Sequence, residues 1–362
     1  MRRSVEREQS HGVPTVASPT ALVPLVVSGL PVTAPPVAVD EHLVLGRGGP
    51  DGLGLGRDPY VSRAHARLRR ISDARLLLES VGPLRVEVNG RPVDRSVLAD
   101  GDVIGVGHSL LLARASAESR DAEVAGLFGN APALRAARRR LMDAAQSKSR
   151  VLLVGERGCG QAAAARAVHR VRRREGRFVR WNSELFPGDL HEAALCARAL
   201  SEAENGTLFV ESITSTSLRA QERLETALGA TDEGARSVAR SSDVAAVAAS
   251  YDDVAECVRS GRLRRALFEC LAESIVHLPP LRECREDILP QLATYFGGPL
   301  PPMTFELLRA IVLHPWPSNA AELPRFATLL RLSVEEARGK RVTLAELAER
   351  LDAVRFASRV PA

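Results

Sequence analysis

Long apolar segments and paired cysteines are both missing from this sequence. No run approaches the roughly 18 apolar residues that a membrane-spanning helix needs, because prolines and a glycine interrupt the apolar stretch at residues 21–39. The five cysteines occur singly and never as a C-x-x-C pair, so we expect neither a complete disulfide framework nor a metal site. The N-terminus has basic residues but no apolar core behind them, so we expect no signal peptide, no membrane partner and a cytoplasmic location.

Lysine is almost absent, and arginine carries nearly all of the positive charge. The net charge of +5 is small for 362 residues and does not by itself indicate a nucleic-acid-binding protein. Arginine runs at 138–140, 172–174 and 262–265 lie in segments with helical patterns. We interpret them as solvated helix faces, and a phosphate-binding track is the alternative.

The first third of the chain has the pattern of a β-protein. Residues 1–20 are mostly polar and predicted to be disordered. Over residues 21–113, short apolar runs alternate with Gly, Pro and Asp, and the pair Asn89-Gly90 marks a tight hairpin turn. This spacing is typical of an all-β sandwich. The small and charged residues at 114–126 suit a linker.

The remainder of the chain has an α/β pattern followed by helices. Apolar runs at 151–155, 207–210 and 244–250 predict buried strands, and helical patterns at 131–145 and 161–174 accompany them. Strands that alternate with helices imply a parallel sheet covered on both faces. From residue 286 onward we predict helices only, at 286–297, 304–313, 319–334 and 343–353.

Four short motifs fall in order within the β-region: Gly46-Arg47, Ser62-Arg63-Ala64-His65, Val88-Asn89-Gly90 and LADGDVI at 98–104. This order resembles forkhead-associated (FHA) domains, which recognise phosphothreonine, over residues 21–113. A phosphate dianion needs charge-assisted donors on rigid loops. An arginine cluster on the loops of a β-scaffold is a known mode of phosphate recognition.

The resemblance implies a role for each matching residue. Arg47, Ser62 and Arg63 would bind the phosphopeptide. The structural support of that site would come from Gly46, His65, Asn89 and Gly90, with His65 bracing the loop that carries the serine. Arg57 is too close to Ser62 to be the phosphate arginine, and we predict a surface residue on the preceding strand.

One position departs from the FHA pattern. The family's asparagine that holds the peptide backbone corresponds to Leu84, within Gly82-Pro83-Leu84-Arg85, when the count runs back from Asn89. Phosphate capture then survives while peptide affinity and specificity fall. The alternative is an FHA fold kept for packing or protein contact, with no phosphopeptide.

A second series of motifs lies in the α/β region. It comprises LFGNAPAL at 127–134, GERGCGQ at 155–161, NGTLFVE at 205–211, HLPPLRE at 277–283 and PWPSN at 315–319. These stretches resemble the central AAA+ domain of sigma-54-dependent transcription activators over about residues 127–335. The resemblance implies a P-loop NTPase-like α/β core at 127–285 and a helical lid with a tail at 286–362. The expected fold is therefore an FHA sandwich followed by an AAA+ core and lid.

The phosphate loop of this second region lacks its lysine. Gly155, Gly158 and Gly160 remain, so backbone N–H groups are still free to cradle phosphates, but the lysine position is Gln161 and the next residue has no hydroxyl for magnesium. At the Walker B position the Asp-Glu pair of the family is replaced by Glu211-Ser212. Glu211 retains a carboxylate for a metal, whereas a serine is a poor general base.

The other positions that the family uses for ATP turnover are altered as well. The position of the family's sensor asparagine corresponds to Tyr251. Of the two arginines that the family presents to a neighbouring subunit, one matches Arg264 and the other falls on Cys270. The sensor II arginine falls on Ala321. Phosphoryl transfer depends on positioning and charge stabilisation, so these losses together remove most of the catalysis. The sigma-contacting G-A-F-T-G-A loop is also absent, and a helix is predicted at 193–205 in its place.

We therefore expect a phosphothreonine-dependent adaptor or regulator in bacterial signalling whose AAA+ domain is a pseudo-ATPase, with no catalytic residue and no cofactor. Its partner would be a phosphothreonine protein, such as a Ser/Thr kinase or its substrate, and the AAA+ domain would self-associate or enter mixed assemblies. No DNA-binding domain is recognised. Two alternatives stay open: an ATP-binding sigma-54-type regulator, using the glycines and Glu211, and a structural scaffold with both sites inert.

Overall fold

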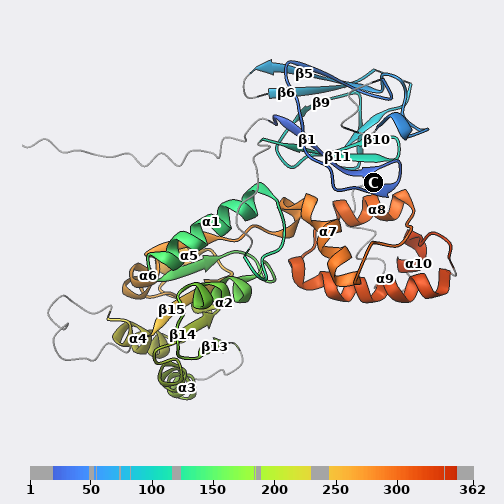
Figure 1. Cartoon of the computed structure of the whole chain (residues 1–362). Helices are drawn as coiled ribbons and strands as arrows, with labels where there is room; N and C mark the ends of the chain where they lie inside the picture. The colour runs from blue at the N-terminus through green and yellow to red at the C-terminus, as the bar shows by residue number, and fades with distance from the viewer. Residues whose placement is uncertain are drawn as a thin grey trace, which may run out of the picture. The chain divides into compact units, whose positions relative to one another are not determined.

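The computed structural model describes residues 19–48, 53, 55–72, 75–81, 83–115, 124–182, 184, 189–229, 244–337 and 339–348. It divides into two compact units, with the boundary after Ala117 (Figure 1). Most of the N-terminal segment predicted to be disordered, residues 116–123 of the predicted linker and the end of the last predicted helix lie outside the described residues.

The N-terminal unit is a sandwich of two antiparallel sheets, as predicted. One sheet has the order β2-β1-β11-β10-β7-β8, with β3 beside β1, and the other has the order β4-β5-β6-β9. The strands of the first sheet are β1 (Ala21–Val27), β2 (Leu30–Pro31), β3 (Val37–Ala38), β7 (Val86–Val88), β8 (Arg91–Val93), β10 (Val103–Val106) and β11 (Ser109–Arg114). Those of the second are β4 (His42–Leu45), β5 (Ala66–Ser72), β6 (Arg75–Ser80) and β9 (Arg95–Leu98). Apolar side chains from both sheets, such as Leu68 and Ile104, form one core between them.

The Asn89-Gly90 turn joins β7 to β8, and both residues have positive φ angles, 52° and 79°. These are the angles of the tight hairpin turn that the pair predicts. The Asn89 side chain also donates to Asp102 Oδ1 at 2.7 Å and accepts from the Val103 N–H at 2.9 Å. The turn is therefore fixed to the neighbouring strand β10.

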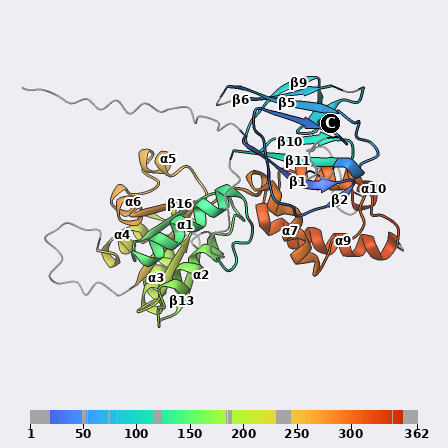
Figure 2. The same ribbon diagram turned by 45° about the horizontal axis from the view of Figure 1, so that its top comes forward.

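The second unit contains a five-stranded parallel sheet in the order β13-β14-β15-β12-β16. Its strands are β12 (Val151–Val154), β13 (Phe178–Asn182), β14 (Thr207–Glu211), β15 (Ala245–Ser250) and β16 (Ser274–His277). Helices α1 (Pro132–Gln146) and α2 (Gln161–Val171) contribute to the core on one face. Helices α3 (Asp189–Glu202), α4 (Leu218–Ala227), α5 (Val254–Arg259) and α6 (Arg265–Leu271) contribute to the core on the other (Figures 1 and 2). The predicted parallel sheet with both faces covered is confirmed.

The rest of this unit is helical, with α7 (Arg285–Phe296), α8 (Phe305–Leu313), α9 (Leu323–Ala337) and α10 (Leu344–Ala348). The helix predicted at 319–334 begins instead as a 3-10 turn, Asn319–Glu322, and continues as α9. Trp316 fixes this turn because its indole is buried against Phe326 and donates to the Ile311 carbonyl at 3.1 Å.

Two of the arginine runs are only in part solvated helix faces: Arg139 and Arg140 are exposed on α1, as predicted, but their neighbour Arg138 is not. Arg138 is buried and donates to the Leu127 and Gly129 carbonyls at 3.2 and 2.7 Å. Helix α2 ends at Val171, three residues earlier than predicted, because Arg173 adopts a left-handed φ of 48° and Arg172 turns back onto the carbonyls that end α1. Among the described helices, none is long and apolar enough to cross a membrane.

Asp287, in the first turn of α7, holds the segment that leads into α1. Its carboxylate accepts the Asn130 and Ala131 N–H groups at 2.6 and 3.0 Å. A Cβ on Gly129 would lie 2.2 Å from Asp287 Oδ2, so this backbone approach requires glycine. Burial raises the pKa of Asp287 from its ordinary 3.8 to about 6.

The raised pKa predicts a fall in stability between pH 4 and pH 6. The folded protein binds more protons than the unfolded chain in this window, so the free energy of unfolding decreases as pH rises through it, by about 3 kcal/mol in total. Denaturant unfolding at several pH values checks this. Asp287→Asn should flatten the slope and Asp143→Asn, on the exposed side of α1, should not; an unchanged slope in Asp287→Asn would refute the assignment.

Candidate functional site

Two backbone segments meet at the end of β4. The Arg47 N–H donates to the Ser62 carbonyl at 2.9 Å, and the Gly48 N–H donates to the Arg63 carbonyl at 3.1 Å. A Cβ on Gly46 would lie 2.2 Å from the Arg63 carbonyl oxygen. Only glycine permits this approach, so Gly46 brings the three residues predicted to bind phosphate to one place.

The charged groups of this place face solvent. Arg47 and Arg63 are exposed, and Ser62 is half-buried. Within the described residues neither arginine forms an ion pair. Two unneutralised guanidinium groups on rigid loops are suited to a doubly charged anion. Arg57 is exposed as predicted, but it ends a 3-10 turn, Leu55–Arg57, rather than lying on a strand.

His65 connects this loop to its surroundings. Its ring Nδ1 accepts a hydrogen bond from the Ser62 backbone N–H at 3.3 Å. Its backbone N–H donates to the Leu45 carbonyl, and its backbone carbonyl accepts from the Val81 N–H. Burial lowers the pKa of the His65 imidazole, so the ring is neutral at neutral pH and its Nδ1 can accept. These contacts fit the bracing role that the FHA resemblance implies for His65.

Asp58 is a supporting residue that the sequence analysis missed. Its side chain is fully buried and accepts the Tyr60 and His108 N–H groups at 3.0 and 2.8 Å and the Ser109 hydroxyl at 2.7 Å. It therefore ties the loop before Ser62 to the β10–β11 hairpin. The only sequence signal for it is the Asp58-Pro59 pair, which is typical of a turn.

Leu84 occupies the position where an asparagine would hold the peptide. Its side chain is 48% exposed, and its carbonyl accepts from the Ser80 hydroxyl at 3.3 Å. The neighbouring Arg85 lies 3.5 Å from Asp94 in an exposed ion pair. The loop therefore offers an apolar side chain at this position, and Gly82 lies outside the described residues.

In the second unit, the glycines of the phosphate loop are enclosed by protein. A Cβ on Gly155 would lie 2.6 Å from the Leu278 carbonyl oxygen, and one on Gly158 would lie 2.0 Å from that of Ser318. Gly160 caps α2 with a left-handed φ of 100°, and a Cβ at this position would collide with the Leu127 side chain. The loop keeps its glycines, but the helical part of the unit lies directly against it at Ser318.

Gln161, at the position of the lysine, turns back onto the loop. It is buried, and its side-chain amide donates to the Gly155 carbonyl at 3.1 Å and to the Glu156 carbonyl at 2.7 Å. These two bonds use both of its N–H groups. The side-chain amide of Gln161 therefore has no further N–H group with which to bind a phosphate.

Glu156 joins the phosphate loop to the helical part of the unit. Its carboxylate forms a two-pronged ion pair with Arg282 and accepts from the Asn319 amide at 3.3 Å. The pKa of Glu156 is lowered, chiefly by the hydrogen bonds from Arg282. Asn319 also donates to the Arg157 carbonyl at 2.8 Å and accepts from the Leu281 N–H.

Arg157 spans the space between the phosphate loop and the ends of the strands. It pairs with Glu184 at 2.5 Å, and its guanidinium carbon lies 4.2 Å from the centre of the Tyr251 ring. Glu184 also accepts from the Ser212 hydroxyl at 2.8 Å. The pKa of Glu184 is lowered, first by the bond from Arg157.

Glu211, the remaining Walker B carboxylate, is also occupied. It accepts from Arg180 Nε at 2.7 Å and from the Tyr251 hydroxyl at 2.9 Å, and its side chain is only 12% exposed. Burial and the nearby Glu211 raise the pKa of Tyr251, so the phenol stays protonated and donates. The predicted nucleotide residues are thus brought to one region, where an internal hydrogen-bond network links them.

Three residues lie at the positions where the family has its two intersubunit arginines and its sensor II arginine. One is an arginine that is paired within this chain, and the other two carry no charge. Arg264 donates from Nε to Glu225 at 2.8 Å and lies 3.1 Å from Glu222, both on α4 of the same chain. Cys270 is a half-buried free thiol. Ala321 lies beside Gly158, with 3.1 Å between its Cβ and the position of a Gly158 Cβ.

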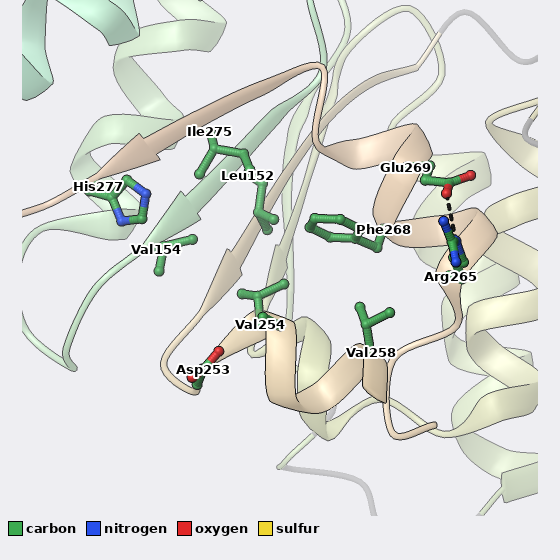
Figure 3. Close-up of a pocket in the computed structure, with 11 residues that line it drawn as sticks. Leu152, Val154, Asp253, Val254, Val258, Arg265, Phe268, Glu269, Ile275 and His277 are labelled. Atoms are coloured by element: carbon green, nitrogen blue, oxygen red, sulfur yellow. Dashed lines mark hydrogen bonds and ion pairs between the residues drawn. The ribbon is translucent and has the colours of Figure 1, made fainter. Parts of the chain in front are cut away.

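A separate apolar pocket of about 610 Å³ lies over β12 and β16, between α5 and α6 (Figure 3). Its floor is formed by residues such as Leu152 and Ile275, and Phe268 closes one wall. The Arg265–Glu269 pair, at 2.8 Å, lies at one end. None of the predicted nucleotide residues lines it. Its lining comes mainly from β12, α5, α6 and β16 and forms no sequence motif, so the sequence alone does not reveal it.

Each of the two units matches a known protein family. The FHA domain family matches residues 43–107, and the sigma-54 interaction domain family matches residues 128–281. The DNA-binding transcriptional regulator NtrC of Bradyrhizobium sp. (strain RP501 Parasponia) is 34% identical over 229 residues, 56% of this chain and 47% of that protein. The transcriptional regulatory protein XylR of Pseudomonas putida is 33% identical over 221 residues, 54% of this chain and 39% of that protein.

The chain thus spans about half the length, or less, of these curated relatives. Among solved structures, NtrX from Brucella abortus in complex with ADP gives a TM-score of 0.54 at 23% identity, covering 65% of this chain and 58% of that chain. This likeness shows the fold alone. Both resemblances drawn from the motifs are confirmed by the family matches.

Gly46→Ala should disrupt the first site. The new methyl group would collide with backbone rather than with a movable side chain, and overpacking of this kind costs about 1–3 kcal/mol. Calorimetry of the full chain should show the unfolding temperature of the N-terminal unit falling by at least about 4 °C. Gly56→Ala is the control, because its nearest atom would be 3.8 Å away; equal shifts in both variants would contradict the close approach.

Proposed function

We propose that this chain, in which an FHA domain is fused to a sigma-54-activator-like AAA+ domain, is a phosphothreonine-dependent adaptor in bacterial signalling. The observation that carries the proposal is the exposed, ion-pair-free arginine couple at Arg47 and Arg63, fixed beside Ser62 by the close approach at Gly46. The partner is a phosphothreonine protein, a Ser/Thr kinase or a kinase substrate.

Rigidity of these loops supports phosphate binding because the donors need no reordering when the ligand arrives. Two backbone hydrogen bonds join the segments, and the buried Asp58 and His65 fix the loop from both sides of Ser62. Hydrogen bonds to a charged group contribute about 1.5–3 kcal/mol each. Leu84 cannot accept or donate through its side chain, so the peptide backbone is held less firmly than the phosphate.

For the second unit, we propose a protein-contact scaffold that neither binds nor hydrolyses ATP. Three contacts support this. Gln161 is turned onto the carbonyls of its own loop, Glu211 is paired with Arg180, and Ser318 lies against Gly158. A nucleotide with its magnesium ion would have to displace a network of charge-assisted bonds, without the lysine that stabilises the phosphates elsewhere in P-loop proteins. These residues do not fit ATP, and no catalytic step is derived from them.

The similar proteins NtrC and XylR are transcriptional regulators by name. A scaffold with the shape of an activator's AAA+ domain can associate with copies of itself or with an intact activator. Under this proposal, phosphorylation of the partner decides where the scaffold is recruited.

The test of the first unit is fluorescence anisotropy with a degenerate phosphothreonine peptide library. The full chain should bind in the micromolar range, and Arg47→Ala should weaken binding by about tenfold or more. Arg57→Ala is the matched control, since this exposed arginine lies in the same loop region but outside the site. Two results would mean that the site is inert, which would leave only a structural scaffold. One is equal binding of phosphorylated and unphosphorylated peptides, and the other is equal affinity of the Arg47→Ala and Arg57→Ala variants.

The test of the second unit is thermal unfolding with ATP and magnesium. A ligand at 100 times its dissociation constant stabilises a protein by about 2.7 kcal/mol, so the absence of any shift at millimolar ATP is the expected result. Gln161→Lys alone should not restore hydrolysis, because Glu211 stays paired and Ser212 is no general base. A clear shift in the wild-type chain would favour an ATP-binding regulator instead.

A further inference from the structure

One short segment of this protein carries a large net positive charge. Residues 166–180 contain seven arginines and one glutamate, a net charge of +6, whereas the whole chain carries +5. The other 347 residues therefore sum to −1. Summed over the rest of the chain, acidic residues balance the basic ones, although residues 135–150 also contain six basic residues and only one acid.

The structure separates these arginines into two groups. Arg172 and Arg174 donate to backbone carbonyls, and Arg180 pairs with Glu211. The other four are exposed, and within the described part of the chain none of them forms an ion pair with a carboxylate. We name this second group the arginine platform: Arg166, Arg170, Arg173 and Arg177.

The platform is built on rigid backbone. Gly176 and Gly206 approach so closely that a Cβ on Gly176 would lie 2.3 Å from the Glu204 carbonyl oxygen, and one on Gly206 would lie 2.1 Å from that of Arg177. The Gly176 N–H donates to Asn205 at 2.9 Å, and the Arg177 carbonyl accepts from the Thr207 N–H at 2.9 Å. The loop that follows α2 is thus clamped to the start of β14.

The arginines lie close together despite their repulsion. Arg166 and Arg170 are one turn apart on α2, about 6 Å along its axis. Arg166 also lies over the ring of Phe178 in β13, 4.8 Å from its centre. Burial lowers the pKa of the intervening His169, and the neighbouring charges of Arg174, Arg166 and Arg170 lower it further. The cations of a helix C-terminus offset the helix dipole, but one arginine would suffice for that.

We infer that the arginine platform binds the phosphate backbone of a nucleic acid without regard to base sequence. Guanidinium groups match phosphate oxygens in two-pronged geometry. A duplex presents one phosphate per about 1.7 Å of its axis, so a patch of this kind faces several charges at once. Such contacts position a protein on nucleic acid and carry no base information.

The surroundings of the platform favour nucleic acid over other polyanions. None of the large apolar side chains that are exposed in the described structure lies between residues 160 and 185. Protein interfaces use aromatic and aliphatic anchors, and membrane-surface helices insert an apolar face. An interface with nucleic acid is polar and positively charged, and the platform has this character.

The experiment is anisotropy of the full chain with a labelled 20-base-pair duplex of arbitrary sequence, titrated with salt. Four phosphate contacts give a slope of about −3.6 in log K against log salt. Substituting alanine at all four platform positions should weaken binding by about tenfold or more at low salt and flatten the slope. Lysine at the same four positions keeps the charge and should retain binding.

A second alanine quartet controls for net charge. It replaces four exposed arginines elsewhere in the same unit: Arg219, Arg223, Arg259 and Arg325. This quartet should bind DNA nearly as well as the wild type. The inference is overturned if both quartets lose binding equally, if the wild type does not bind, or if phosphatidylserine vesicles or polyglutamate bind the platform more tightly than DNA. Thermal unfolding checks that each variant is folded. If the alanine variant of the platform does not fold, DNA binding by the lysine variant tests the inference instead.

Discussion

The guanidinium of Arg157 links three segments of the second unit at the place where an ATPase would hold nucleotide. It connects the phosphate loop to Glu184 and to the ring of Tyr251, which in turn donates to Glu211. On the other side of the loop, Glu156 is paired with Arg282. In an active P-loop protein, bound phosphates and a metal ion link these elements. Here side chains of the protein link them.

The two candidate sites differ in how their arginines are partnered. In the FHA domain, Arg47 and Arg63 have no ion-pair partner among the described residues, and supporting groups fix the backbone rather than the charge. In the AAA+ domain, Arg157, Arg180 and Arg264 are all neutralised within the chain. A charge that is to meet an external anion must be left unpaired, and one that replaces a ligand must be paired. This contrast supports the proposal that the first site recognises an external anion and that the second site is occupied by the chain's own side chains.

Much of this could be predicted from the sequence, for reasons that differ by feature. The sandwich, the parallel sheet and the Asn89-Gly90 turn follow from local patterns of apolar residues and turn residues, and the structure confirms them. The end of α2 could not be predicted, because a left-handed Arg173 and the carbonyls that receive Arg172 belong to tertiary structure. Asp58 was missed because one buried acid carries no periodic signal. The pairing of Arg264 within its own chain depends on contacts between residues distant in sequence. Gln161 donates to carbonyls only five and six residues away, but its orientation depends on the path of the loop, which the residue pattern does not specify.

The most direct test of the whole account is hydrogen–deuterium exchange of the full chain, with a phosphothreonine peptide library and with ATP and magnesium added separately. The account predicts slower exchange at residues 46–48 and 62–65 with the phosphopeptides, because these N–H groups lie in the loops that hold the phosphate. It predicts no change at residues 155–161 or 211–215 with ATP. Protection of the phosphate loop by ATP, or no protection of the FHA loops by phosphopeptide, would contradict it.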